Sequence, residues 1–188
     1  MQALWIWGTA GLVYVAFLGW YRNWRSPLGR DEIARHFDRL DARAGAGDRD
    51  DLAKLRAFLE ADDGREFFML NLVRLALEPV ADPVTGHPEP AATTLEGYTR
   101  TFLPALARRA GHPALVARKV GPYVDSWGVE ADPGWSFIGY MRYRSRRDLL
   151  ELVSDPRFAG AHAFKIAAMP ATLNFPTQPR LMTLVGPR

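Results

Sequence analysis

The sequence predicts an α+β fold, a ferredoxin-like unit with the order βαββαβ that follows a transmembrane helix and two amphipathic helices. An uncharged apolar run opens the chain. Two charged segments with the period of an amphipathic helix come next, and four apolar runs with the character of strands then alternate with helical segments. We therefore divide the chain into an anchor with a basic collar (residues 1–30), a helical stalk (31–62) and a domain (63–188).

Residues 3–20 form the predicted anchor, since they carry no charge and their only polar members are Thr9 and Tyr14. At a rise of about 1.5 Å per residue, this helix covers roughly 27 Å, close to the ~30 Å hydrocarbon core of a bilayer. Bulky Trp20 and Tyr21 close the run and no basic residue precedes it, which favours an uncleaved anchor over a signal peptide. A buried or interfacial helix is the other alternative.

Charge predicts on which side of the membrane the domain lies. The first arginines, Arg22, Arg25 and Arg30, all follow the anchor, so the positive-inside rule predicts a single-pass protein of the inner membrane with a cytoplasmic domain. All 21 acidic residues come after Arg30, and so do all but three of the 24 basic ones, which leaves the rest of the chain formally neutral. A neutral domain argues against nucleic acid as a partner.

Two amphipathic helices are expected between the anchor and the domain. Apolar residues recur at helical spacing on each side of a glycine-containing break at residues 45–47. They are Ile33, Phe37 and Leu40 in the first helix and Leu52, Leu55, Phe58 and Leu59 in the second. Each helix has one apolar face, so we expect both helices to pack on the domain as a stalk.

The domain opens with a strand over residues 67–75, FFMLNLVRL. Strand alternation places Asn71 on the same face as Met69 and Val73, so one amide lies within a hydrophobic strand. Residues 78–92 contain four prolines, which predicts a long irregular loop that can act as a lid.

Helices and strands alternate in the rest of the domain. Thr93 and Glu96 form a capping box, which predicts a helix from this point to Gly111 that is kinked or restarted at Pro104. The remaining predicted elements are strands at residues 113–120, 135–143 and 171–175, a helix capped by Ser145 and Asp148, a second helical piece from Asp155-Pro156, and a tail at 181–185.

Helices on one face of such a sheet leave its other face open. Ile138 and Tyr140 of the third strand or their neighbours are then exposed, and face-to-face pairing of two copies is the usual way to cover an apolar sheet face. We therefore expect a homodimer.

Three segments carry a resemblance to a known family. They are residues 69–75 (MLNLVRL), residues 141–158 (MRYRSRRDLLELVSDPRF) and the following Ala161-His162. In these segments the chain resembles a bacterial family of unknown function within the dimeric α/β-barrel superfamily. The resemblance covers roughly residues 52–179 and implies a dimeric α/β barrel. The superfamily includes heme-degrading monooxygenases, cofactor-free monooxygenases and lactone isomerases, so the resemblance implies no single reaction.

His162 and Asn71 are the candidate catalytic residues. The resembled family often carries a histidine at the position of His162, and an imidazole with a pKa of about 6.5 suits proton transfer at neutral pH. Heme ligation and a structural surface histidine are the alternatives. Asn71 can donate a hydrogen bond to a substrate carbonyl or an oxyanion in a dry pocket. It can equally tie its strand to the loop at residues 78–92.

The candidate substrate-binding residues are Tyr98, Arg118, Tyr140 and Arg142. Tyr140 and Arg142 share a face of the third strand, and Arg118 of the second strand is expected to join them in an aromatic and cationic cleft. Such a cleft suits an anionic or phenolic small molecule. Interface salt bridges with Asp125 or Glu130 explain the same arginines about equally well.

The remaining basic residues have simpler interpretations. Arg144, Arg146 and Arg147 are most simply a solvated helix start, with phosphate or lipid contact as the alternative. We predict no metal site, because the other histidines, His36, His87 and His112, share no spacing.

These features favour a membrane-tethered dimer that binds and converts a small aromatic or lipophilic molecule, anionic ones included, without a metal or another cofactor. One alternative is a non-catalytic dimerisation or assembly module at the membrane. The other is a heme-binding protein that uses His162.

Overall fold

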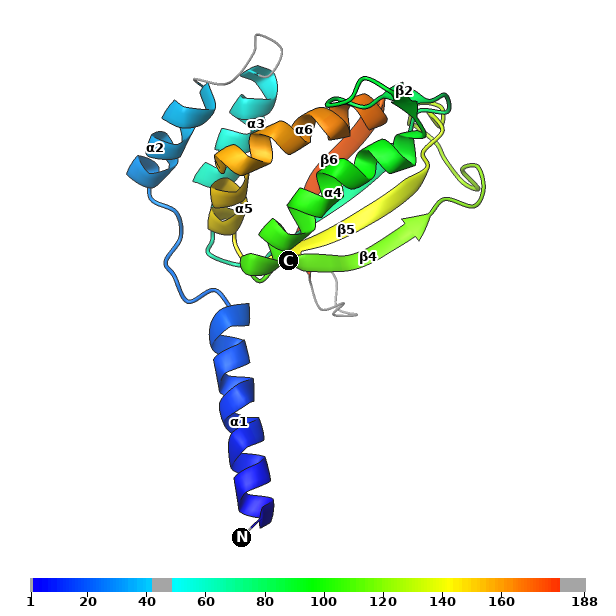
Figure 1. Cartoon of the computed structure of the whole chain (residues 1–188). Helices are drawn as coiled ribbons and strands as arrows, with labels where there is room; N and C mark the ends of the chain where they lie inside the picture. Colours follow the sequence, from blue (N-terminus) through cyan, green and yellow to red (C-terminus); the bar gives the residue numbers. More distant parts are fainter. Residues whose placement is uncertain (1, 42–48, 180–188) are drawn as a thin grey trace.

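One helix stands apart from the rest of the chain. The computed structural model describes residues 2–41 and 49–179, and its first helix, α1 (Gln2–Tyr21), projects away from the sheet and the other helices (Figure 1). No residue of the segment Leu4–Tyr21 is buried. Within the described residues, this is the one helix whose length and composition suffice to cross a membrane.

Four antiparallel strands form the main sheet, in the order β4-β5-β1-β6. Their bounds are Phe67–Arg74 for β1, His112–Arg118 for β4, Phe137–Tyr143 for β5 and Ala171–Thr177 for β6. One helix separates β1 from β4 in the sequence, and two helices separate β5 from β6. This order and pairing confirm the predicted ferredoxin-like βαββαβ arrangement.

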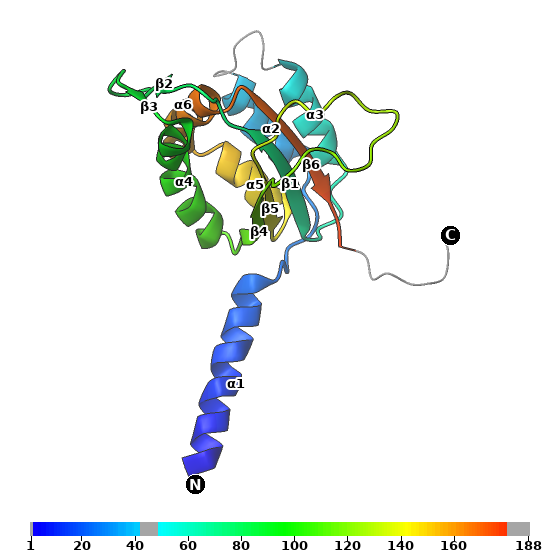
Figure 2. The same ribbon diagram turned by 90° about the vertical axis from the view of Figure 1, so that its right-hand side faces the viewer.

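Two helices cover one face of this sheet, α4 (Ala91–Arg108) and α6 (Pro156–Ala168). Both views show them on the same side of the sheet (Figures 1 and 2). Gly97 allows their close approach, because a Cβ atom at this position would lie 2.5 Å from Cδ1 of Phe164. The short helix α5 (Arg146–Val153) precedes α6.

The start of α4 differs from the prediction. The helix begins at Ala91, before the predicted capping box, and Pro90 precedes it without a side-chain cap. Thr94 is buried in the first turn, where its Oγ1 donates to Oε1 of Glu89 at 2.8 Å. The helix also continues through Pro104, so of the two predicted outcomes the restart is wrong, and the kink stays a prediction.

The starts of α5 and α6 confirm the prediction. Ser145 Oγ accepts a hydrogen bond from the backbone N–H of Asp148 at 3.2 Å. Asp155 Oδ1 accepts one from the backbone N–H of Arg157 at 3.0 Å, with Pro156 at the beginning of the helix. In both cases a short polar side chain satisfies an N–H group that the first helical turn leaves free.

Helices α2 (Arg30–Asp41) and α3 (Arg49–Glu60) pack against α5. A buried cluster joins them, formed by Ile33 and Phe37 of α2, Leu59 of α3 and Leu150 of α5. Both amphipathic helices are therefore present, and their apolar faces share a core with the domain. The break expected at residues 45–47 and the tail expected at 181–185 lie outside the described residues.

The segment between β1 and α4 is more regular than predicted. Val80–Ala81 (β2) pairs with Pro88–Glu89 (β3). Between them, Oδ1 of Asp82 accepts hydrogen bonds from the backbone N–H groups of Val84 and Thr85. The expectation of a wholly irregular loop is wrong because an aspartate turn brings the two short strands together.

The two faces of the main sheet have different surroundings. On the helix side, the ring of Phe67 stacks on Tyr143 with 5.0 Å between centroids, within a core that continues into α4 and α5. On the opposite face apolar side chains keep much of their exposure, namely 51% for Leu115, 49% for Leu173 and 41% for Phe175. The sheet therefore presents an open apolar face, as its topology predicts.

Candidate functional site

A cavity of about 430 Å³ lies between the helix side of the sheet and helices α4 and α6. Alternate residues of β1 and β5 line it from the sheet, and the two helices line it from the other side. Most of the lining is apolar, and includes Met69, Val73, Leu95, Phe102, Leu103, Val116, Phe137, Met141, Leu149, Leu152, Val153, Phe158 and Met169. Small-molecule sites are typically concave and mostly apolar in this way.

Gly139 keeps the middle of the sheet wall free of a side chain. It pairs with Asn71 of β1 on one side and with Val116 of β4 on the other. A Cβ atom at this position would have Cε of Met141, at 3.1 Å, as its one neighbour within 4 Å among the described residues. A larger side chain here would therefore extend into the cavity.

Asn71 lines the cavity, and its hydrogen bonds leave one polar atom for a ligand. Its Nδ2 donates to the backbone oxygens of Met69 at 2.9 Å and Gly139 at 3.0 Å. Because both neighbours are acceptors, the amide nitrogen must occupy that side and Oδ1 the other. The geometry supplies an acceptor where the sequence led us to expect a donor. These bonds hold the amide to β1 and β5 and not to the loop at residues 78–92.

Four polar side chains line the cavity from the helices: Tyr98 and Thr99 of α4, and His162 and Lys165 of α6. His162 and Lys165 are three residues apart and share a face of the helix. The Lys165 ammonium lies 5.9 Å from the centre of the Tyr98 ring. Of the predicted site residues, the structure thus brings together Asn71, Tyr98 and His162 around one cavity.

Lys165 is a site residue that the sequence reasoning missed. Burial lowers the pKa of Lys165, and no carboxylate of the described residues offsets this effect. Burial also raises the pKa of the Tyr98 hydroxyl, because it disfavours the charged form of either group. The spacing of three residues from His162 was the signal in the sequence that could have revealed Lys165.

Arg118 does not join Tyr140 and Arg142 in the expected cleft. Tyr140 lies on the open face of the sheet, where its ring stacks on Phe68 at 5.1 Å. Arg118 pairs with Phe137 in the β4–β5 register, which places it on the helix side of the sheet, and its side chain is exposed. A register shift near the start of β4 separates them, because a shift of one residue moves a side chain to the other face.

Arg142 is a buried structural residue with 3% of its side chain exposed. Its guanidinium donates to Oε2 of Glu66 at 2.7 Å, to the backbone oxygen of Ala110 at 2.7 Å and to that of Tyr21 at 3.2 Å. It also lies 3.7 Å from the centre of the Tyr21 ring. The carboxylate partner is therefore Glu66, not either acidic residue of the β4–β5 loop, and the contacts connect the sheet to the end of α1.

The arginines at the start of α5 are not solvated, so that prediction is wrong. Arg144 pairs with Asp148 at 2.5 Å, and Arg147 pairs with Glu32 of α2 at 2.6 Å. Arg146 retains only 11% of its side-chain exposure. The stalk helices and the segment after α1 pack against this region, and they cover the charges that the local sequence placed on a surface.

Comparison with known proteins identifies the fold but not the function. No family model and no curated protein matches the sequence. A crystal structure of a protein of unknown function from Rhodopseudomonas palustris matches with 23% identity and a TM-score of 0.59, over 70% of this chain and 93% of that chain. The methylated form of that protein matches with 23% identity and a TM-score of 0.55, over 71% and 92%. This chain shares their fold.

A third solved structure is more distant. It is a dimeric protein of unknown function with a ferredoxin-like fold from Bacteroides fragilis, at 13% identity and a TM-score of 0.38, over 60% of this chain and 95% of that chain. The descriptions of these three structures name no activity.

The histidines of the described residues have separate environments. His36 Nδ1 lies 2.9 Å from Oγ of Ser154, and His112 Nε2 lies 2.9 Å from the Tyr21 hydroxyl. Within the part of the chain that the structure describes, no three His, Asp or Glu side chains gather as a metal site would require. His162 is the histidine that lines the cavity, so it is the residue placed to move a proton or bind a heme iron there.

Proposed function

We propose that this protein is a membrane-tethered dimer of the α/β-barrel type that binds, and converts without a metal, a small aromatic or lipophilic molecule. The observation that carries the proposal is the apolar cavity whose lining includes Asn71, Tyr98, His162 and Lys165. The apolar lining suits the body of such a ligand, and the few polar groups suit one polar end.

The polar groups have distinct parts in this proposal. The Lys165 ammonium binds an anionic or phenolate oxygen, because no carboxylate of the described residues neutralises it. Asn71 Oδ1 accepts a hydrogen bond from a ligand hydroxyl, since the amide nitrogen is already engaged. His162 takes a proton from the ligand and returns it to the product, a role for which an imidazole is suited near neutral pH.

Tethering fits a ligand that partitions into the bilayer. In the proposal α1 crosses the inner membrane and the domain lies in the cytoplasm, as the arginines after α1 predict. Alkaline washing of cell membranes tests the anchor. The full chain is expected to stay with the membrane pellet, and its release into the wash would exclude a spanning α1.

Two copies are proposed to pair through their open sheet faces. Leu115, Leu173 and Phe175 would then be covered by the partner. Leu173→Lys together with Phe175→Lys should halve the protein mass measured by light scattering, after correction for detergent. Leu77→Lys, at a residue with 92% exposure in the β1–α4 connection, should leave the mass unchanged. A monomeric wild-type protein would exclude the dimer.

The proposed ligand is tested by releasing bound molecules from detergent-purified full-length protein and identifying them by mass spectrometry. Gly139→Leu fills the cavity, so it should abolish the retained molecule. His87→Ala, in the exposed turn between β2 and β3, should retain it. Conversion is followed with the identified molecule, and His162→Ala should slow it by roughly 100-fold or more.

Two outcomes would replace this proposal. Wild-type protein that carries no ligand, and that Gly139→Leu leaves unchanged in every assay, would favour a non-catalytic dimerisation or assembly module, for which the open apolar face is the supporting observation. A heme Soret band in the purified protein that disappears in His162→Ala would favour the heme-binding alternative.

A further inference from the structure

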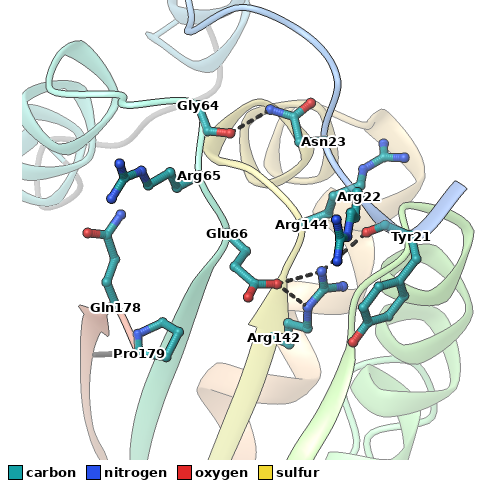
Figure 3. A pocket seen from close by; sticks show the side chains of 10 residues that line it. All are labelled: Tyr21, Arg22, Asn23, Gly64, Arg65, Glu66, Arg142, Arg144, Gln178 and Pro179. Carbon is teal, nitrogen blue, oxygen red and sulfur yellow. Dashed lines mark hydrogen bonds and ion pairs between the residues drawn. The ribbon is translucent and has the colours of Figure 1, made fainter. Parts of the chain in front are cut away.

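A second hollow, of about 540 Å³, lies where the sheet meets the end of α1. Figure 3 shows that its walls come from the residues just after α1 and from the ends of β1, β5 and β6 that face this helix. Four of its residues are arginines, Arg22, Arg65, Arg142 and Arg144, and one is a carboxylate, Glu66. The hollow is therefore cationic, in contrast to the apolar cavity.

Two of these arginines hold the end of α1 in place. Arg142 donates to the backbone oxygen of Tyr21 at 3.2 Å, and Arg144 donates to that of Trp20 at 2.9 Å. These oxygens belong to the last turn of α1, whose carbonyls have no partner within the helix and carry its negative dipole end. The hollow consequently has a fixed position beside the helix.

The other two arginines are available to a ligand. Arg22 and Arg65 are exposed, and neither guanidinium has a hydrogen-bond or ion-pair partner among the described residues. Glu66 pairs with Arg142, and Asp148 pairs with Arg144. These two carboxylates balance two of the four arginines and leave two positive charges, so the hollow should bind an anion.

We infer that this hollow binds the phosphate group of an anionic phospholipid headgroup. The inference rests on the proposed membrane tether. If α1 spans the bilayer, the residues directly after Tyr21 lie at the level of the headgroups, where Trp20 and Trp24 also favour the interface. A headgroup then presents its phosphate beside α1 at high local concentration, and cationic pockets next to spanning helices bind such groups.

The test is native mass spectrometry of full-length protein in detergent, titrated with phosphatidylglycerol or with phosphatidylcholine. Phosphatidylglycerol should bind more tightly. Arg22→Gln and Arg65→Gln should each weaken its binding roughly fivefold, the effect expected for one arginine near a membrane surface. Arg30→Gln is the control, because it removes a charge of the basic collar from outside the hollow and should change nothing. Unchanged thermal melts show that both variants fold.

Three outcomes would overturn the inference. Equal binding of the two lipids would do so, as would an equal loss in Arg30→Gln, which indicates general charge attraction. Glycerol 3-phosphate that binds as tightly as phosphatidylglycerol would identify a free phosphate compound as the ligand instead of a lipid. Release of the wild-type chain in the alkaline wash would remove the tether and this inference together, whereas a retained chain without lipid preference would remove the inference alone.

Discussion

The two hollows of this protein have similar volumes and opposite chemistry. The cavity between the sheet and α4 and α6, of about 430 Å³, places Lys165 among apolar side chains without a neutralising carboxylate among the described residues. The hollow beside α1, of about 540 Å³, contains arginines of which Arg142 and Arg144 are ion-paired and bound to backbone oxygens. Removing one partner of a buried ion pair is destabilising because it leaves the other charge unpaired, and an unpaired cation in an apolar site is destabilising for the same reason. Lys165 is therefore the stronger candidate for a functional cation.

The largest change in the free energy of unfolding should come from Arg142→Met, which removes an ion-paired arginine from the hollow beside α1. The substitution leaves the backbone oxygens of Ala110 and Tyr21 without their donor and removes the partner of Glu66. We expect the free energy of unfolding, measured with urea in detergent, to fall by about 3 kcal/mol. Arg100→Met, at an exposed i,i+4 pair on α4, should change it by less than about 0.5 kcal/mol. Equal effects would mean that Arg142 is not structural.

The second largest loss of stability should come from a substitution between α4 and α6, the two helices beside the apolar cavity. In Gly97→Ala the new methyl group meets the ring of Phe164 at 2.5 Å, so α4 and α6 must move apart. We expect a loss of about 2 kcal/mol in the free energy of unfolding, as is typical of overpacked sites. Gly160→Ala is the control on α6, where nothing lies within 4 Å, and it should stabilise slightly. A neutral Gly97→Ala would show that the helix wall adapts.

Lys165→Met should change the free energy of unfolding in the opposite direction, so that the protein becomes more stable. Replacing a desolvated cation with an apolar side chain of similar shape is expected to raise the free energy of unfolding by about 1 kcal/mol at pH 7. Burial lowers the pKa of Lys165, so the unfolded chain binds more protons than the folded one between the folded pKa and the unfolded value of about 10.4. Wild-type stability therefore rises with pH across this window.

The advantage of Lys165→Met should accordingly shrink as the pH approaches about 10. Urea unfolding at pH 7 and pH 10 measures the difference. Lys54→Met, at an exposed lysine, should show no such dependence on pH. A variant less stable than wild type at pH 7 would mean that Lys165 makes a stabilising contact, and would remove the contrast between the two hollows.

Local patterns predicted much of the fold and part of the apolar cavity. Period-two and helical spacing are set by nearby residues, which is why the strand order, the Ser145 and Asp155 caps and the cavity-side position of Asn71 could be predicted. The same spacing placed His162 on a helix of the domain. That His162 lines the same cavity as Asn71 depends on the packing of α6 against the sheet, which only the structure describes.

The hollow beside α1 could not be predicted because its contacts join distant parts of the chain. Arg142 reaches Glu66, 76 residues away, and Tyr21, 121 residues away. No periodicity encodes such a pairing. Arg118 was misplaced for a different reason, since one shifted residue in β4 reverses the face on which every following side chain lies.

An effect no larger than that of Lys165→Met should come from Tyr21→Phe, which separates two interactions at the end of α1. The substitution removes the hydroxyl that lies 2.9 Å from His112 Nε2 and keeps a ring 3.7 Å from the Arg142 guanidinium. We expect a loss of about 1 kcal/mol in the free energy of unfolding, the usual contribution of one hydrogen bond. Tyr14→Phe, on the exposed part of α1, should have no effect. A loss in Tyr21→Phe as large as that of Arg142→Met would mean that the hydroxyl, and not the paired arginine, holds α1 to the sheet.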